Sequence, residues 1–514
     1  MSGSGLIGAP SPRAPRSGPP VGTLLAVVVL VVIALVGGTL AKPKAAAVST
    51  TQIPVQGATA VCPDLRQFKD ELASRVSVGA APLAEGQKST DGAIRQHTNS
   101  TPTSLQRVPV TAPGQVAIGL GTSLNGDALV FGATGSFSAG LEAEQVTRGE
   151  RGRDRGLAGL RCEAPRQEAW FVGGNTSIGD LTTLVLVNVD DTPATVDVTT
   201  FSSAGPPEQP GLGEGFTIDP HRRVLINLDT LIPDRKLLAV HVNSRRGRVA
   251  AALRTSSLAG KVALGVDWVP QSTPPSASVL VPGIPQLSDG GSRVILITNP
   301  SSDDTEVSVQ VMTSDGQFVP TGMDAINVPA GSTGFVKLND LAKDSALSAR
   351  VTSKDGTPIL AGGFIGDVNT DAPAHEFAYT AGSSPLSGPA LLTDLVINRP
   401  TESTLVLTAP DRAATVKLTL IRVLGTVYSL PKLKDVRIPA GRTVTVKLST
   451  FYRPGANVKI ALEVTPVVGS GPVYAARYLA EHGAHGPLTT ELDLQGPATA
   501  VTRPQVNEDP RVGY

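Results

Sequence analysis

The stretch Ile326-Asn327-Val328-Pro329-Ala330-Gly331, which continues as Thr333-Gly334-Phe335-Val336-Lys337-Leu338, decides how this chain folds. A turn containing proline and glycine separates a short apolar segment from a segment in which apolar and polar residues alternate. Such alternation is typical of a half-buried β-strand. The same phrase returns at residues 437–448, and weaker copies lie at residues 217–228 and 110–120. A phrase that recurs four times predicts a repeated β module.

The spacing of the copies sets the size of the module. Their prolines, Pro113, Pro220, Pro329 and Pro439, lie 107, 109 and 110 residues apart. This period is too long for a solenoid repeat or a propeller blade, and it suits a β-sandwich of about 100 residues. Chance similarity among strands rich in valine and threonine is the alternative, but regular spacing argues against it. The first copy is the weakest and predicts a degenerate terminal module.

Further strand patterns recur around the phrase. Residues 294–300 are followed by the alternating segment 307–311, and residues 184–188 and 405–407 are followed by comparable segments. No amphipathic helical pattern alternates with these strands. The fold is therefore predicted to be all-β, with tandem antiparallel β-sandwich modules of immunoglobulin-like type. Because two alternating faces can bury each other, we expect each module to fold independently.

Composition excludes one class of partner and describes the cores. The chain has 44 basic and 44 acidic residues, so its formal net charge is zero and no nucleic-acid partner is predicted. It contains 54 glycines and 42 prolines, which favour turns, and aromatic residues make up 4% of it. The module cores must therefore be built from aliphatic side chains.

An apolar segment near the start predicts a membrane anchor. Residues 21–41 contain no charged side chain. As a helix, about 21 residues at roughly 1.5 Å each would span the hydrocarbon core of a bilayer. A cleaved signal peptide is the alternative, since Ala45-Ala46-Ala47 follows, although its apolar core would be shorter. We expect a single-pass protein of the cytoplasmic membrane with residues 42–514 extracytoplasmic.

These observations predict a division of the whole chain. The expected parts are a cytoplasmic tail (1–20), a transmembrane helix acting as signal anchor (21–41), a linker (42–60), a degenerate β module (61–168), three β-sandwich modules (169–276, 277–388 and 389–494) and a flexible tail (495–514).

The two cysteines, Cys62 and Cys162, both follow the apolar segment. An exported pair most simply forms a disulfide, and closing a loop of about 100 residues stabilises by up to roughly 4.7 kcal/mol. Two separate buried thiols are the alternative. Neither cysteine has a cysteine or histidine at ligand spacing, so no metal site is predicted there.

Several segments together resemble a known family. Cys162-Glu163-Ala164-Pro165 is followed by residues 168–174, 184–188 and 194–198, and later by residues 281–285 and Asn299-Pro300. Over roughly residues 60–490 this order resembles actinobacterial membrane-anchored proteins grouped as domain of unknown function 5719. The resemblance implies an envelope location and a modular architecture, without an established activity or site residues.

We predict no catalytic, cofactor or metal site. Ser123 lacks the second glycine of a nucleophile elbow and is interpreted as a turn residue. His482 and His485 lack a third ligand, and Asp303-Asp304 is interpreted as a solvated hairpin end rather than a calcium site. Trp170 and Trp268 stand beside valine and phenylalanine, which indicates core packing rather than sugar stacking.

The predicted function is a non-catalytic binding or scaffolding role in the cell envelope. The partners we expect are the membrane, through residues 21–41, and an envelope protein or cell-wall glycan. The alternative is a carbohydrate-binding accessory protein in cell-wall glycan assembly, and the scarcity of aromatic residues counts against it. A hydrolase is a third hypothesis, for which we find no paired carboxylates and no Ser/His/Asp site.

Overall fold

A computed structural model describes residues 50–63, 72–83, 88–120, 126–206, 211–286, 291–367, 375–396, 401–424, 432–450, 459–496 and 500–504. The chain divides into two compact units, one made of residues 53–501 and the other of residues 1–52 and 502–514. The expected transmembrane segment, 21–41, lies outside the described residues. Within the described ranges, no helix is long and apolar enough to cross a membrane.

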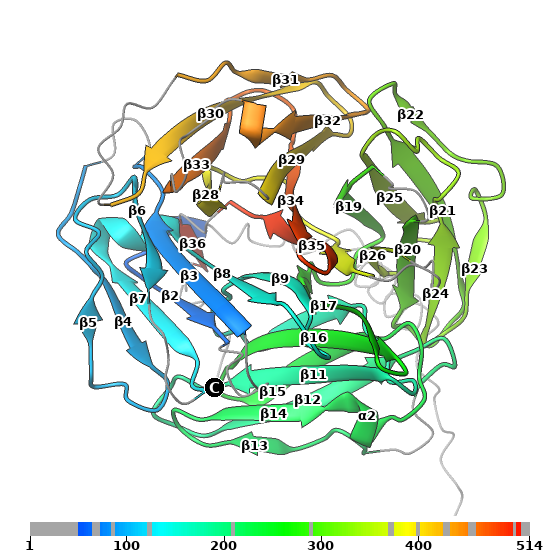
Figure 1. Ribbon diagram of the computed structural model, residues 1–514, viewed down its shortest axis with the longest axis horizontal. Coiled ribbons are helices and arrows are strands. Elements are labelled where there is room, and N and C mark those ends of the chain that lie inside the picture. Colours follow the sequence, from blue (N-terminus) through cyan, green and yellow to red (C-terminus); the bar gives the residue numbers. More distant parts are fainter. Residues whose placement is uncertain are drawn as a thin grey trace, which may run out of the picture. The chain divides into compact units, whose positions relative to one another are not determined.

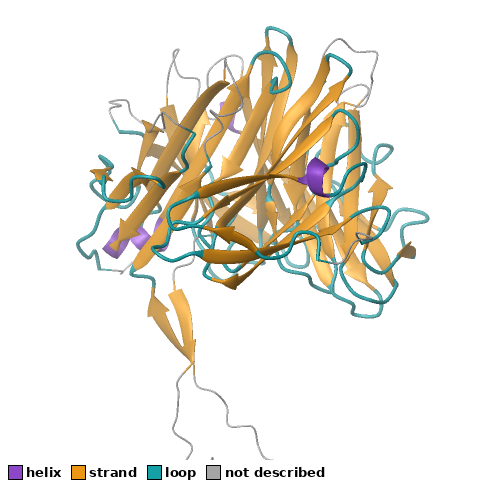
Figure 2. Ribbon diagram, turned by 90° about the horizontal axis from the view of Figure 1, so that it is seen from below, coloured by secondary structure: helices purple, strands orange, loops and turns teal. Residues whose placement is uncertain are grey.

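The described chain is all-β, as the sequence predicts, and its few helices are short, with three to six residues each (Figure 2). All named strand pairs of the unit 53–501 are antiparallel. Outside its sandwiches, β1 (Thr50–Pro54) and β36 (Ala500–Pro504) pair as a two-stranded sheet. The short helical turns are η1 (Gly135–Gly140), α2 (Leu228–Leu231) and η2 (Leu448–Thr450).

The first sandwich pairs the sheet β2-β7-β4-β5 with the sheet β6-β3-β8-β9. Its strands are β2 (Gly57–Cys62), β3 (Leu72–Ala80), β4 (Ile94–Thr98), β5 (Gln106–Arg107), β6 (Gln115–Leu120), β7 (Leu129–Thr134), β8 (Leu141–Gly149) and β9 (Gly156–Arg161). The second sandwich pairs β13-β12-β15-β10-β18 with β14-β11-β16-β17. Its strands are β10 (Glu168–Val172), β11 (Asp180–Val187), β12 (Ala194–Phe201), β13 (Phe216–Ile218), β14 (Arg223–Asn227), β15 (Ala239–Arg246), β16 (Ala250–Ala259), β17 (Val262–Val269) and β18 (Gln271–Ser272).

The third sandwich pairs β19-β25-β21-β22, with β23 beside β21, with the sheet β24-β20-β26-β27. Its strands are β19 (Ser278–Ile284), β20 (Gly291–Asn299), β21 (Thr305–Met312), β22 (Gln317–Phe318), β23 (Ile326–Val328), β24 (Ser332–Lys337), β25 (Leu347–Ser353), β26 (Leu360–Asp367) and β27 (Phe377–Ala381). The fourth sandwich pairs β28-β33-β30-β31 with β32-β29-β34-β35. Its strands are β28 (Ala390–Val396), β29 (Thr401–Ala409), β30 (Ala414–Arg422), β31 (Val436–Ile438), β32 (Arg442–Lys447), β33 (Lys459–Pro466), β34 (Tyr474–Gly483) and β35 (Gly486–Leu494).

Each sandwich buries an aliphatic core between its two sheets. In the fourth, Val416 and Leu418 of β30 share one cluster with Leu405 and Leu407 of β29, from the facing sheet. The structure does not confirm the immunoglobulin-like assignment. In that fold the first two strands share a sheet, whereas β28 and β29 lie in different sheets here.

The repeated phrase marks the same structural position in every sandwich. Its turn precedes β6, β14, β24 and β32, and each of these is an edge strand of its four-stranded sheet. The last turn residue has a positive φ in each copy, at Gly114 (82°), His221 (56°), Gly331 (61°) and Gly441 (70°). Because L-residues rarely adopt this conformation, three of the four copies use glycine. The repeat therefore reflects shared turn chemistry.

The four sandwiches of the unit 53–501 surround a common centre (Figure 1). The opposite edges of the same four sheets are the inner strands β9, β17, β27 and β35. Strand β9 contacts β17 and β35, and β27 contacts the same two strands, so the inner strands form a closed cycle. Each sandwich therefore keeps its own core and also shares this centre with the other three, and the independent folding of a module stays a prediction.

Backbone hydrogen bonds also join three pairs of sandwiches away from the inner strands. The Thr333 amide donates to Ser202 of the second sandwich (3.0 Å), and the Thr443 amide donates to Thr313 of the third (3.0 Å). The Leu424 amide of the fourth sandwich donates to Val116 of the first (3.0 Å). The last sandwich therefore packs against the first.

Candidate binding pocket and buried polar centre

The predicted disulfide between Cys62 and Cys162 is present. Cys62 ends β2 and Cys162 follows β9, so the bond links the two sheets of the first sandwich. Both residues are buried, and their Cα atoms lie 4.6 Å apart although 100 residues separate them in sequence. The bond therefore holds the start of the first sandwich to its last strand.

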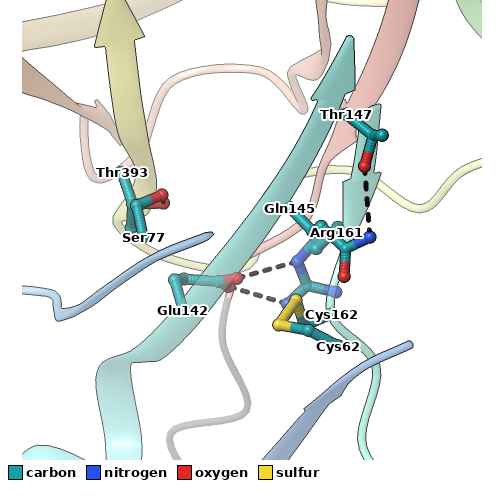
Figure 3. The surroundings of a disulfide bond; sticks show 8 residues. All are labelled: Cys62, Ser77, Glu142, Gln145, Thr147, Arg161, Cys162 and Thr393. Carbon is teal, nitrogen blue, oxygen red and sulfur yellow. Dashed lines mark hydrogen bonds and ion pairs between the residues drawn. A yellow bond between two sulfur atoms is a disulfide. The ribbon is translucent and has the colours of Figure 1, made fainter. Parts of the chain in front are cut away.

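A largely buried ion pair, in which the side chains of Arg161 and Glu142 are 14% and 3% exposed, lies next to this disulfide (Figure 3). Arg161 donates two hydrogen bonds to Glu142, of 2.7 and 2.8 Å, and a longer one of 3.4 Å to Glu163. Burial lowers the pKa of Arg161, but the charges of Glu142 and Glu163 outweigh that effect and raise it above its ordinary value. The guanidinium remains charged and is held in one orientation.

A pocket of about 970 Å³ opens beside the disulfide. Its walls are residues 57–60 of β2, parts of β4 and β7, and residues 161–166, with Arg248 of the second sandwich completing the lining. Cys162 is itself part of the lining. This volume lies within the range of ligand-binding clefts.

The charged side chains that line the pocket are mostly basic. Arg95, Arg161, Arg166 and Arg248 line it, against Glu163 as the one carboxylate of the described lining. The side chains of Arg166 and Arg248 are 52% and 50% exposed. Arg166 lies 3.5 Å from Glu163, while Arg248 donates to both oxygens of Asp190 at 2.9 and 3.0 Å. The pocket therefore presents guanidinium groups to solvent.

A second polar feature lies where the inner strands meet. Gly159 of β9 donates its amide to the Thr490 hydroxyl of β35 (2.8 Å), and that hydroxyl donates to Asp267 of β17 (2.7 Å). The other oxygen of Asp267 accepts from the amide of Tyr379 in β27 (3.0 Å). One hydrogen-bond network thus joins all four sandwiches around a carboxyl group that is fully buried.

Two more buried carboxyl groups lie at this centre. Burial raises the pKa of Asp267, Glu376 and Glu491 well above their ordinary values. Nearby carboxyl groups add to the shift for Glu376 and Glu491, since the charge of Asp267 acts on both. Burial favours the neutral acid, and the charges of Arg155 near Glu376 and of Arg477 near Glu491 offset this effect only in part. We name Asp267, Glu376 and Glu491 the central acids.

A third buried set joins the fourth sandwich to the first. Arg477 donates to Glu144 (3.0 Å) and to the Asp394 carbonyl (2.7 Å), and the carboxylate of Asp394 pairs with Arg75. Ser77 and Thr393 share a hydrogen bond of 2.6 Å beside them. Breaking a buried pair of this kind leaves an uncompensated charge, so these contacts make the interface specific.

The other residues singled out from the sequence are distributed over the fold. Trp268 and Trp170 are buried, as core packing predicts. Asp304 accepts a hydrogen bond from the Ala330 amide (2.8 Å) at the hairpin end. His482 and His485 lie at the β34–β35 hairpin, and within the described ranges no three His, Cys, Asp or Glu side chains are placed to hold a metal ion. Ser123 lies outside the described residues.

Sequence reasoning missed both the pocket arginines and the central acids. The pocket side chains come from positions 95 to 248, and nothing local marks them as a group. A signal for the central acids does exist, because Asp267 stands between Val266 and Trp268, and Glu491 and Asp493 flank Leu492 in strands with apolar neighbours. Acidic residues in such strands indicate buried carboxyl groups.

The comparison with protein families identifies the chain. A model of the family of unknown function DUF5719 matches residues 121–449, which is more than half of the sequence. The chain belongs to DUF5719. The match begins within the first sandwich and ends within the fourth, so it includes Cys162 and the central acids Asp267 and Glu376 but neither Cys62 nor β35. No curated protein and no solved structure matches the chain.

Proposed function

We propose that this DUF5719 protein is a single-pass, membrane-anchored protein of the cell envelope, with residues 42–514 outside the cytoplasmic membrane. Residues 21–41 serve as its anchor. Its role is binding or scaffolding rather than catalysis. The observation that carries the proposal is the buried Cys62–Cys162 disulfide, because such bonds persist in oxidising, extracytoplasmic compartments.

The arrangement of the sandwiches supports a scaffold. Four cores are held together by a closed cycle of inner strands and by buried polar contacts between sandwiches. A body fixed in this way presents loops and edge strands at constant positions, which suits recognition of a partner. The pocket beside the disulfide supports a binding role. Its described lining has no Phe, Tyr or Trp side chain, so it does not favour a carbohydrate-binding role through stacking.

The proposal is tested by the location of the carboxyl terminus and the state of the thiols. We fuse to the full chain, after Tyr514, a reporter that is active only outside the cytoplasm. This reporter should be active. Thiol alkylation of the native protein without reductant should label neither Cys62 nor Cys162. Activity of a cytoplasm-specific reporter at the same position, or full labelling of both thiols, would contradict the proposed location.

A further inference from the structure

The disulfide joins two parts of the chain that line the pocket. One wall of the pocket is formed by residues 57–60 of β2, and a second wall includes residues 161–166. Cys62 continues the first wall and Cys162 belongs to the second, so the disulfide ties the two walls together. The pocket is therefore pre-formed, and a ligand would not have to supply the free energy needed to order it.

The basic side chains of the pocket differ in what they can do. The side chain of Arg161 is only 14% exposed and its guanidinium is engaged by Glu142 and Glu163, so it acts as a structural support. Arg95 and Arg166 are exposed, and Arg166 keeps only a long contact of 3.5 Å to Glu163. These two guanidinium groups retain donors that a ligand can accept from.

A like-charge pair adjoins the pocket. Arg95 of β4 lies directly opposite Arg107 of β5 in the register of the two strands. Opposed like charges on neighbouring strands are destabilising. Among the described residues, no carboxylate forms an ion pair with either arginine. An anionic ligand would supply the missing counter-charge.

The lining also indicates the class of ligand. Aside from His97, no aromatic side chain is found in the described lining, so stacking of a sugar face on Phe, Tyr or Trp is not available there. Arginine recognises carboxylate and phosphate through paired, charge-assisted hydrogen bonds. Arg95 lies on β4 and Arg166 follows β9, so a ligand with two anionic groups can pair with both guanidinium groups.

We propose that the pocket beside the Cys62–Cys162 disulfide binds a ligand with at least two anionic groups, phosphate or carboxylate, through Arg95 and Arg166. This inference deepens the binding role proposed above and rests on it. The pocket can fail to bind such a ligand while the protein is still an anchored, exported scaffold. The two proposals are therefore tested separately.

Binding is measured by calorimetry on the full chain in detergent micelles, with three probes. Pyrophosphate and citrate supply phosphate and carboxylate groups, and cellotetraose is an uncharged oligosaccharide. We expect at least one of the two anions to bind with an affinity that falls as salt is raised, and cellotetraose not to bind. The tighter of the two anions identifies the preferred group.

The double variant Arg95→Gln with Arg166→Gln should weaken anion binding by about tenfold or more, because it removes two charge-assisted contacts. Arg437→Gln is the matched control, since Arg437 is also exposed on a short strand but lies in the fourth sandwich. It should leave the affinity unchanged. All variants alter exposed side chains, and equal melting temperatures verify that they fold.

Three outcomes would overturn the proposal. The first is no binding of either anion by the wild-type chain. The second is an equal loss of affinity in the Arg95/Arg166 variant and in the Arg437 control, which would show non-specific attraction. The third is cellotetraose binding that exceeds anion binding.

Discussion

Asp267 is the residue at which the four sandwiches converge. Its carboxyl group accepts from Thr490 and Tyr379, and Thr490 in turn accepts from Gly159. Ionising a carboxyl group in this position costs free energy, because it is fully buried and, among the described residues, no cationic side chain forms an ion pair with it. The same reasoning applies to Glu491, which is equally buried. The protonation of single residues is therefore coupled to the stability of the whole unit.

Glu491 provides a test of this coupling through pH. Its folded-state pKa is raised well above the ordinary value, mainly by burial and then by Asp493 and Asp267. The stability linked to a raised carboxyl pKa is fully present below the unfolded pKa of about 4.3, and it is lost as pH rises through the folded pKa. Glu491→Gln keeps the shape and removes the titration. We expect the variant to match the wild type near pH 4.5 and to melt at a higher temperature at pH 8.

The control for this comparison is Glu306→Gln, since the Glu306 side chain is 59% exposed. Its melting temperature should follow that of the wild type at both pH values. Asp493, whose pKa burial raises to about 6, contributes in the same direction and should add to the decline of stability above pH 4. Parallel pH profiles for the wild type and Glu491→Gln would show that Glu491 does not ionise within this range.

The repeated phrase continues into the edge strands β6, β14, β24 and β32. In β32, alternating residues face the core and the solvent. Val446 is buried and belongs to the core of the fourth sandwich, while Lys447 is exposed and pairs with Glu402 at 3.2 Å. Neighbouring residues of one strand thus face opposite environments.

Two substitutions in β32 compare how much its core-facing and its solvent-facing side chains contribute to the free energy of unfolding. Val446→Asp places a carboxylate between the sheets and should lower the free energy of unfolding by several kcal/mol, about 2–5. Lys447→Asp loses only an exposed ion pair and should cost about 1 kcal/mol or less. Urea unfolding of the full chain, followed by circular dichroism, gives both values. Equal losses from the two substitutions would mean that both faces of β32 are buried.

The whole unit 53–501 owes its integrity to surfaces shared between sandwiches. On the fourth sandwich, Leu391 packs against Val116, and Leu488 packs against Leu157 of the first. Arg477 and the carboxyl group of Glu491 are also buried in the assembled unit. An excised module would expose these apolar side chains to water, although it retains its own core.

Excision of residues 389–494 tests how far one sandwich is self-sufficient. Because its core is complete, we expect a β-type circular dichroism spectrum from the fragment. Because its shared surface becomes exposed, we expect a melting temperature well below that of the full chain and self-association in sedimentation. Leu391→Lys with Leu488→Lys should restore a monomer. A wild-type fragment that is monomeric and melts with the full chain would establish that the sandwiches are independent.

The sequence by itself determined the class of fold and its period. Alternation and turn chemistry act over a few residues, so the phrase around Pro329 and its copies predicted antiparallel strands and the turns between them. The structure adds that Gly331 and Gly441 have a positive φ in two of these turns. Cysteine counting found the Cys62–Cys162 pair for a similar reason, since two exported cysteines leave one simple pairing. The strands and turns depend on the order of neighbouring residues, and the disulfide pairing depends on the number of cysteines.

Only the tertiary structure decided how the sandwiches meet and which side chains meet with them. The central acids come from three sandwiches, and the pocket is formed by residues as far apart as Val55 and Arg248. Such groupings depend on contacts between strands that are one hundred or more residues apart. In an alternating sequence, the apolar face of a strand shows that it is buried, but it does not specify the partner. Packing of β9, β17, β27 and β35 into one cycle selects that partner and brings the buried carboxyl groups together.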